Sequence, residues 1–425
     1  MPMPYRLNPM GKNEKKYFEL IVKPGILTTG MSYGFTPYWL SGGYCKVDWG
    51  DGQKEDAVTS GTALNHTYAE AGTYTVKIKA ECYQVRCASP LLCDCSENWD
   101  ELGSMTGSNG FLNMTFDAAS NLTHVFKTLP SELRYAAYMF RNCGKADFVM
   151  SELPDSLISG DSMFSSCTKA QLPLASLPAG LTNASHMFYS CTNAQLPLTS
   201  LPTGLTNGDT MFKDCSNAQL PLASLPNGLT NGTSMFYNCS NAELSLDRLP
   251  SGLTNGYQMF WYCSKANFTF TKLPDSLVNG VNMFNGCTNA ELPLTELPAS
   301  LTLGAVGNGM FNNCSNAKLP LTSIPEGVTN GFAMFNNCKN AALPLTKLPD
   351  GLTNAKNMFN GCKNAEINLD TLVANAPAEG WTKLTDIANM FYGCSKVTGS
   401  RSAFLAKLPN VTNTAGAFAG TNTTE

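Results

Sequence analysis

The stretch Leu205-Thr-Asn-Gly-Asp-Thr-Met-Phe-Lys-Asp-Cys-Ser-Asn-Ala-Gln-Leu-Pro-Leu-Ala-Ser-Leu-Pro226 decides the fold, because close copies of it recur along most of the chain. Met-Phe pairs follow at a spacing of 24 residues, beginning at 139, 163, 187, 211, 235, 259 and 283. The next pairs begin at 310, 334, 358 and 390. Degenerate copies of the repeat at Thr115-Phe116 and Ala417-Phe418 bring the array to thirteen coils. A fixed period of this length predicts a solenoid of stacked coils with atypical ends.

The Met-Phe-x-x-Cys part of each coil predicts a short helical turn. Met211 and Cys215 are four residues apart, and Phe212 and Cys215 are three apart. This spacing places all three side chains on the inner side of such a turn. Asn207 is a suitable N-cap for it.

The second half of the coil predicts an extended segment. Leu220 and Leu222 alternate with period two and therefore point the same way. Leu225 and Leu229 continue the inward set, and Pro226 turns the corner. The central proline of Leu-Pro-Leu cannot donate to a ladder, so we expect a narrow sheet that lacks one bond per coil at this column. This proline recurs at 173, 197, 221, 293, 320 and 344.

Eleven of the sixteen cysteines occupy one position of the coil, from Cys143 to Cys394. Equivalent side chains in stacked coils point the same way into the core, so we expect small buried hydrophobes rather than disulfides or metal ligands. Outside the repeat, the spacing of four further cysteines fits a zinc site poorly. These are Cys82, Cys87, Cys93 and Cys95. A disulfide that fastens this linker and free thiols are the alternatives.

Met-Phe-x-x-Cys, followed by alternating leucines and a Leu-Pro corner, resembles the BspA-like leucine-rich repeats of bacterial surface proteins. The resemblance covers about 300 residues and recurs coil by coil. It implies an elongated solenoid, a strand after the cysteine, and a role in adhesion or host contact. The chain departs from the family by carrying alanine, as at Ala194 and Ala218, where leucine is frequent three residues after the cysteine.

The N-terminal part predicts a β-sandwich. Tyr74, Val76 and Ile78 alternate with polar residues, as in a half-buried strand. The stretches Cys45-Lys-Val-Asp-Trp-Gly-Asp-Gly52 and Asn65-His-Thr-Tyr-Ala-Glu-Ala-Gly-Thr-Tyr-Thr-Val76 resemble the PKD (polycystic kidney disease) domain. That resemblance implies an immunoglobulin-like sandwich that acts as a spacer or binding module. Asp48 and Asp51 are considered as cation ligands, but carboxylates in such a turn are more often structural.

Composition and motifs argue against several classes of function. Only 14% of residues are charged and the net charge is −4, so a broad nucleic-acid footprint is not expected. No apolar run is long enough for a membrane span, and no secretion signal is visible. Nucleophile elbows, phosphate loops and dinucleotide fingerprints are missing. We therefore expect no catalytic residues, no cofactor and no metal.

A recognition surface is expected where the coils differ. The position after Met-Phe carries a run of large side chains, with two more tyrosines nearby. The candidate patch comprises Tyr189, Lys213, Tyr237, Tyr257, Trp261 and Tyr262. The alternative is that these side chains cover coil edges or pack on the N-terminal domain. The longer coils after Met283, Met358 and Met390 carry insertions that are expected to form loops, a second candidate surface.

The chain is therefore expected to be mainly β: an immunoglobulin-like sandwich followed by a leucine-rich-repeat-like solenoid with short strands and short helical turns. We divide it into a tail (1–16), a PKD-like domain (17–81), a cysteine-containing connector or cap (82–110) and the solenoid (111–425). The expected function is non-enzymatic recognition of a protein or glycan ligand on a cell surface. The alternatives are a phage virion appendage and a carbohydrate-binding scaffold accessory to an enzyme. The expected location is a bacterial surface or a virion surface, with envelope or virion proteins as further partners of the N-terminal domain.

Overall fold

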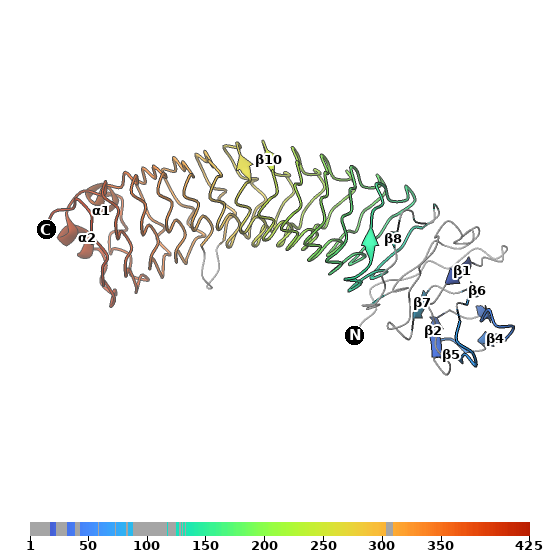
Figure 1. Ribbon diagram of the computed structural model, residues 1–425. Coiled ribbons are helices and arrows are strands. Elements are labelled where there is room, and N and C mark those ends of the chain that lie inside the picture. Colours follow the sequence, from blue (N-terminus) through green and yellow to red (C-terminus); the bar gives the residue numbers. More distant parts are fainter. Residues whose placement is uncertain are drawn as a thin grey trace.

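The computed structural model describes residues 18–22, 32–38, 43–57, 59–72, 74–81, 84–87, 117, 125–126, 129, 131, 133–302 and 309–425. From residue 133 onward these residues form coils that stack along a curved axis, with the two helices at the C-terminal end (Figure 1). The solenoid predicted from the 24-residue period is therefore confirmed.

Two antiparallel sheets form the described N-terminal region. One has the order β1-β6-β3-β4 and the other the order β5-β2-β7. The strands are β1 (Phe18–Val22), β2 (Ser32–Tyr38), β3 (Tyr44–Asp48), β4 (Lys54–Ala57), β5 (Leu64–Thr67), β6 (Val76–Glu81) and β7 (Gln84–Cys87). Val76 and Ile78 are buried while Lys77 is exposed, as their alternation predicted. Trp49 and Tyr68 are buried in this core, where the Tyr68 hydroxyl donates to the Trp49 carbonyl at 2.9 Å.

The segment from Gly208 to Cys215, and its equivalent in other coils, is a hydrogen-bonded turn rather than a helix; we call it the turn segment. The N–H groups of Thr210 and Phe212 donate to carbonyls of the next coil, at 2.8 and 2.9 Å. The intervening N–H of Met211 donates within its own coil, to Gly208, at 3.1 Å. Successive N–H groups thus donate alternately to the next coil and to their own coil. The prediction of a helical turn was therefore wrong.

Left-handed backbone conformations at two positions per turn segment make this alternation possible. Thr210 and Asp214 have φ values of 50° and 62°, and their equivalents in most other coils are also positive. Such values cost free energy for residues other than glycine. The regular ladder between coils offsets that cost, because every turn segment repeats the same bonds.

An asparagine column opens the turn segments. The Asn207 carboxamide oxygen accepts from the Asp209 N–H at 3.1 Å. This is the bond predicted for Asn207, but it opens a turn rather than a helix. Asn231 repeats this bond to Thr233, also at 3.1 Å, and donates from Nδ2 to the Asn207 oxygen at 3.1 Å. The column therefore bonds both within each coil and along the stack.

We expect Asn231→Ala to lower the free energy of unfolding by about 1–2 kcal/mol, because it removes the cap and one bond of the column. Asn231→Asp loses only the Nδ2 bond to Asn207 and keeps the cap acceptor, as Asp386 does in this column by accepting from Ala388 at 2.8 Å; it should therefore lose less than Asn231→Ala. Urea unfolding followed by circular dichroism measures both variants. A loss in Asn231→Asp as large as that in Asn231→Ala would contradict a capping role.

Proline decides where the coils form strands. The described solenoid has two parallel strand pairs, β8 (Val125–Phe126) with β9 (Asp147–Phe148) and β10 (Ser245–Leu246) with β11 (Asn267–Phe268). None of these strands contains Leu-Pro-Leu. Ser245 stands where other coils have proline, and its N–H donates to the Leu222 carbonyl at 3.0 Å. Pro221 cannot make this bond, as predicted. The extended segment and narrow sheet predicted along Leu-Pro-Leu are wrong, however, because none of the described Leu-Pro-Leu segments forms a strand.

Where proline is present, the chain kinks instead of forming a strand. The Leu222 N–H donates to the Leu220 carbonyl at 2.7 Å, which closes a tight turn around Pro221. Leu220 has a φ of 41°, and so does each described leucine that precedes this proline, within a few degrees. Leu220 and Leu222 are nevertheless both fully buried, as predicted. The next corner is a turn closed by the Leu229 N–H on the Pro226 carbonyl at 3.0 Å.

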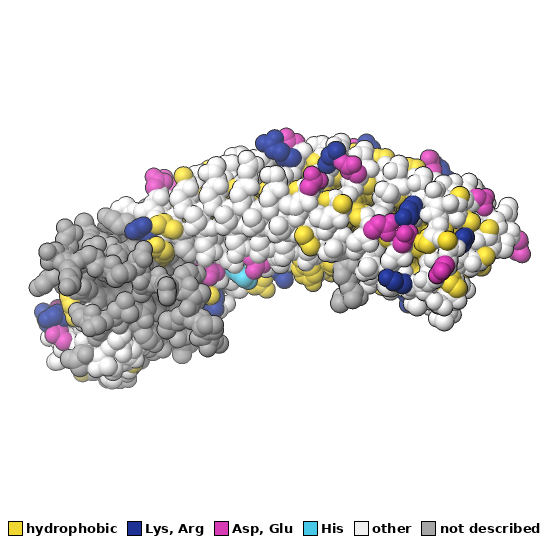
Figure 2. Space-filling model, turned by 180° about the vertical axis from the view of Figure 1, so that it is seen from behind, with side chains coloured by type: hydrophobic (Ala, Val, Ile, Leu, Met, Phe, Trp, Pro, Cys, Tyr) yellow, Lys and Arg dark blue, Asp and Glu magenta, His cyan; other side chains and the backbone are white. Residues whose placement is uncertain are grey.

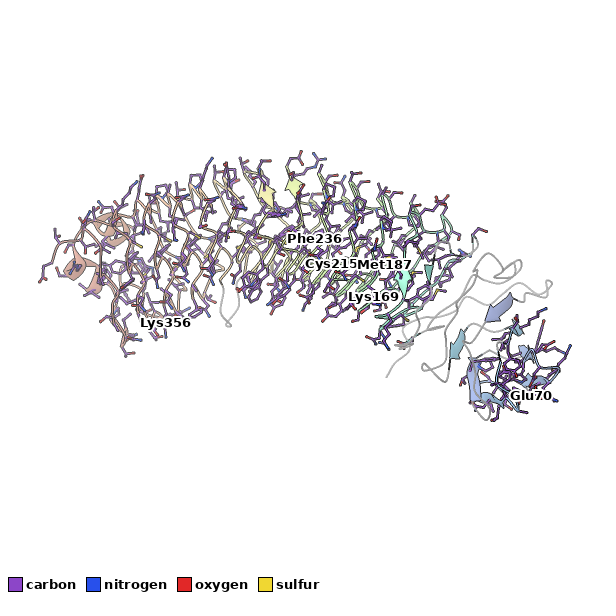
Figure 3. The ribbon with its side chains drawn as sticks, viewed as in Figure 1. Glu70, Lys169, Met187, Cys215, Phe236 and Lys356 are labelled. Atoms are coloured by element: carbon purple, nitrogen blue, oxygen red, sulfur yellow. The ribbon has the colours of Figure 1, made fainter. Side chains whose placement is uncertain are left out.

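The interior consists of columns of identical side chains. Phe212 and Phe236 stack with ring centroids 5.5 Å apart, and similar stacks continue from Phe140 to Phe418. Met187, Cys215 and Phe236 come from successive coils and lie between the two margins of the solenoid, whereas Lys356 lies at the lower margin (Figure 3). Because each column is buried on both sides by its own copies, one coil cannot form this core alone.

The cysteine column is a ladder of thiol hydrogen bonds. The ten cysteines from Cys167 to Cys394 are buried free thiols, which confirms their prediction as small core residues. Cys239 Sγ donates to the Phe212 carbonyl of the preceding coil at 2.9 Å, and the other nine make the equivalent bond. Burial raises the pKa of these thiols, to about 12 for Cys191 and Cys394.

Two of the three insertions form helices rather than the loops we expected. Helix α1 (Leu369–Ala374) begins at the cap Asn368, and α2 (Arg401–Leu405) begins at the cap Ser400. Both bury side chains, and Phe404 of α2 packs against the buried Trp381 with centroids 5.7 Å apart. These insertions therefore extend the core at the C-terminal end. The extra residues of the coil after Met283 include 303–308, which lie outside the described residues.

Candidate functional site

The candidate patch lies on the outer side of the turn segments, which we call the turn face. It comprises the two residues before each Met-Phe pair and the two after it. These positions change from coil to coil, while the inward residues stay nearly constant. Lys356 occupies the same column as Tyr257, so its place in Figure 3 locates the turn face at the lower margin. Acidic, histidine and hydrophobic side chains follow one another along this margin (Figure 2).

The structure brings the predicted row together. Lys213 Nζ lies over the rings of Tyr189 and Tyr237, 5.9 and 4.6 Å from their centroids. Tyr237 in turn packs against Trp261, with centroids 5.3 Å apart. All four side chains are half-buried. Each therefore covers its neighbour, so most of this row is occupied by contacts within the protein.

Tyr257 and Tyr262 are the members that remain open to solvent, with 36% and 48% exposure. They flank the buried Met-Phe pair of one coil. Their phenols and the Asp214 carboxylate act electrostatically on Tyr237, whose pKa is raised first by burial and then by these neighbours. The accessible centre of the patch is therefore this one coil, with Asp214 at its edge.

Glycine in the following coil positions the Tyr262 ring. A Cβ at Gly286 would collide with Cδ1 of Tyr262, so the ring lies directly against the Gly286 backbone. Gly286 has a φ of 77°, but Asp214 and Asn238 adopt similar values at this column. The backbone alone therefore does not require glycine here; room for the tyrosine ring does.

Two polar atoms of this coil and the next are buried without a hydrogen-bond partner in the protein. They are Trp261 Nε1 and Asn285 Oδ1. Asn285 is only 5% exposed and donates from Nδ2 to Asn282 at 3.1 Å, which leaves its oxygen unsatisfied. Such groups are rare in folded proteins, and others occur elsewhere in the described chain, at Asp147, Thr210 and Trp381.

Sequence reasoning missed a cluster of titratable groups in the neighbouring coils. Burial raises the pKa of Asp161 and Asp209, and His186 lies close enough to both carboxylates to oppose that rise. His186 Nδ1 is 2.8 Å from the Ser185 hydroxyl. Asp161, Ser185 and Asp209 are each 24 residues apart, so the repeat register was the signal that could have revealed the cluster.

The carboxylates of Asp48 and Asp51 accept hydrogen bonds within the turn between β3 and β4. Asp48 accepts from the Gly50 N–H at 3.1 Å, and this bond together with Lys54 lowers its pKa. Asp51 accepts from the Gln53 N–H and lies 2.7 Å from His66 Nε2. No cluster of three or more metal-ligating side chains occurs among the described residues. Of the four linker cysteines considered for a disulfide, Cys87 is the last residue of β7. Cys82, Cys93 and Cys95 lie outside the described residues.

A comparison with known protein families found a match to the repeat region of the chain. Residues 110–219, 133–267 and 254–398 match the family of the BspA type leucine-rich repeat region, and together these matches span more than half of the chain. The chain belongs to this family. Its members are typically associated with cell surfaces and adhesion. A comparison with curated proteins gave no match. Among the described helices, none is long and apolar enough to cross a membrane.

Proposed function

We propose that this BspA-type repeat protein is a non-enzymatic recognition protein that binds a ligand on a cell surface through the turn face of its solenoid. The observation that carries the proposal is the contrast within each coil. Met, Phe, Cys and Leu are buried and nearly constant, whereas the turn face varies and exposes Tyr257 and Tyr262. Exposed aromatic side chains that lie together are typical of binding surfaces.

The N-terminal sheets have a separate role in this proposal. We propose that they form a PKD-like spacer that holds the solenoid away from its point of attachment. The support is the pair of antiparallel sheets and the buried Trp49 and Tyr68 from the two stretches that resemble PKD domains.

Binding of the fluorescently labelled full chain to epithelial and bacterial cells tests the recognition function. We expect Tyr257→Ala/Tyr262→Ala to weaken binding about tenfold or more, because exposed aromatic anchors dominate recognition. The double variant Lys272→Ala/Glu296→Ala is the control, since it neutralises an exposed ion pair outside the turn segments. Equal binding of the tyrosine variant and the unaltered chain would exclude this part of the turn face as the recognition surface.

The place of display is also part of the proposal. We favour a bacterial envelope, in keeping with the family, over a phage virion. The neighbouring genes distinguish the two, because capsid and portal genes beside this one would assign the protein to a virion.

A further inference from the structure

We propose that the turn face around Tyr257 and Tyr262 binds a neutral carbohydrate chain; this ligand class rests on the recognition function proposed above. A pyranose ring has an apolar face of C–H groups and a rim of hydroxyls. It is therefore recognised by an exposed aromatic ring with polar groups beside it. Tyr257 and Tyr262 supply two such rings in a single coil.

The groups around these rings match the hydroxyl rim. Gln258 and Asn282 are partly exposed amides on the turn face beside the two tyrosines, and neither carries charge. The Asp214 carboxylate, held by Asn238 Nδ2 at 3.0 Å, adds a strong acceptor at one edge. The oxygens of Gln258 and Asn282 already accept from Ser234 and Asn285, so these amides offer mainly their N–H groups to hydroxyls, and the carboxylate offers acceptors.

The spacing of the coils suits a chain of sugars rather than a single one. Aromatic rings of neighbouring coils lie 5.3 Å apart for Tyr237 and Trp261, and 5.6 Å apart for Phe236 and Phe260. These distances are comparable to the advance of one ring in an extended β-linked polysaccharide. Phe236 and Phe260 are buried, so their spacing measures only the rise of the coils. A glycan laid along the solenoid axis would advance about one coil per sugar, with one sugar on the tyrosine coil and its neighbours over the polar groups of the adjacent coils.

Affinity electrophoresis of the full chain tests this proposal, with soluble mixed-linkage β-glucan, galactomannan, α-mannan and amylopectin as probes. A glycan array adds mammalian and microbial oligosaccharides. We expect retardation by at least one probe, weakened about tenfold or more in Tyr257→Ala/Tyr262→Ala. Leu405→Ala should bind as the unaltered chain does, because Leu405 is 39% exposed but lies in α2, outside the turn face.

Gly286→Asn provides a variant that keeps both tyrosines. Asn238 shows that asparagine adopts this backbone conformation, so the substitution should displace the Tyr262 ring without unfolding the coil. Circular dichroism and thermal unfolding verify the fold. We expect weaker retardation from this variant too.

Two results would overturn the carbohydrate assignment. One is failure to bind every polysaccharide and every glycan of the array. The other is retardation that is unchanged in the double tyrosine variant. Cell binding that survives periodate but is lost after protease treatment would reject the carbohydrate while leaving recognition by the turn face intact. If the unaltered chain bound neither epithelial nor bacterial cells, that result would instead count against the proposed function.

Discussion

The stability of the solenoid should fall steeply above about pH 8.5, the ordinary pKa of a cysteine thiol. Burial raises the pKa of the ten thiols from Cys167 to Cys394, so the folded chain keeps their protons while the unfolded chain releases them. Their contribution is fully present below the unfolded pKa. It is lost as the pH rises toward the folded values, which are about 12 for Cys191 and Cys394.

The expected size is large because the thiols act together. Each one should favour unfolding by about 1.4 kcal/mol per pH unit above its unfolded pKa. A segment that unfolds as a unit therefore loses stability in proportion to the number of coils it contains. Urea unfolding under reducing conditions, at intervals between pH 7 and pH 10.5, measures this dependence.

Replacing four thiols separates their effect on alkaline unfolding from the effect of tyrosine side chains, which also lose protons at high pH. The variant Cys191→Ala/Cys215→Ala/Cys239→Ala/Cys263→Ala should be less stable at pH 7, since it loses packing and four bonds to phenylalanine carbonyls. Its stability should nevertheless depend less on pH, by about 1.4 kcal/mol per pH unit for each thiol removed. An unchanged slope would show that the buried thiols do not control the alkaline transition.

Phe236→Ala should lower the free energy of unfolding by about 3–5 kcal/mol, the usual cost of removing a buried phenylalanine. Phe236 is fully buried and stacks on Phe212 and Phe260, with centroids 5.5 and 5.6 Å away. Since repeat proteins are stabilised through contacts between neighbouring coils, the loss should be concentrated at this point of the array. Hydrogen exchange should therefore increase most in the coils beside residue 236.

The matched variant Phe236→Leu should lose less, because it retains most of the buried apolar volume. Tyr392→Ala should change stability by no more than about 0.5 kcal/mol, as expected for an exposed side chain. A loss below about 1 kcal/mol in Phe236→Ala would show that the phenylalanine stack contributes little.

The inward residues could be predicted from the sequence because each recurs at a fixed interval. Met211, Phe212 and Cys215 are all fully buried, as predicted. The backbone of the turn segment could not be predicted from the same spacing. The partner of the Thr210 N–H is the Thr233 carbonyl, 23 residues away in the next coil, so a local pattern cannot distinguish this turn from a helix.

The helices of the insertions carried a signal that was overlooked. Asn368 precedes Leu-Asp-Thr-Leu, and its side chain accepts from the N–H groups of Asp370 and Thr371. Ser400 caps α2 in a similar way. Asparagine or serine before a short apolar run is a recognised sign of a helix start.

The site was predictable as a row of residues that includes Tyr257 and Tyr262, but the sequence did not indicate which members are open to solvent. The position after Met-Phe indicated Tyr237 and Trp261, which the structure shows to be half-buried by their neighbours. The position of the Tyr262 ring depends on Gly286, which belongs to the next coil. Such a relation between positions 24 residues apart becomes visible only when the coils are placed side by side.

The uniform ladder between turn segments has a consequence for how such a protein can change over generations. Each coil offers the same carbonyls to the coil before it and the same amides to the coil after it, as Phe212 and Phe236 illustrate. Recombination between repeats that adds or removes a whole coil therefore preserves the backbone bonds between turn segments. New turn faces can be acquired by shuffling existing coils, without any compensating change in the core.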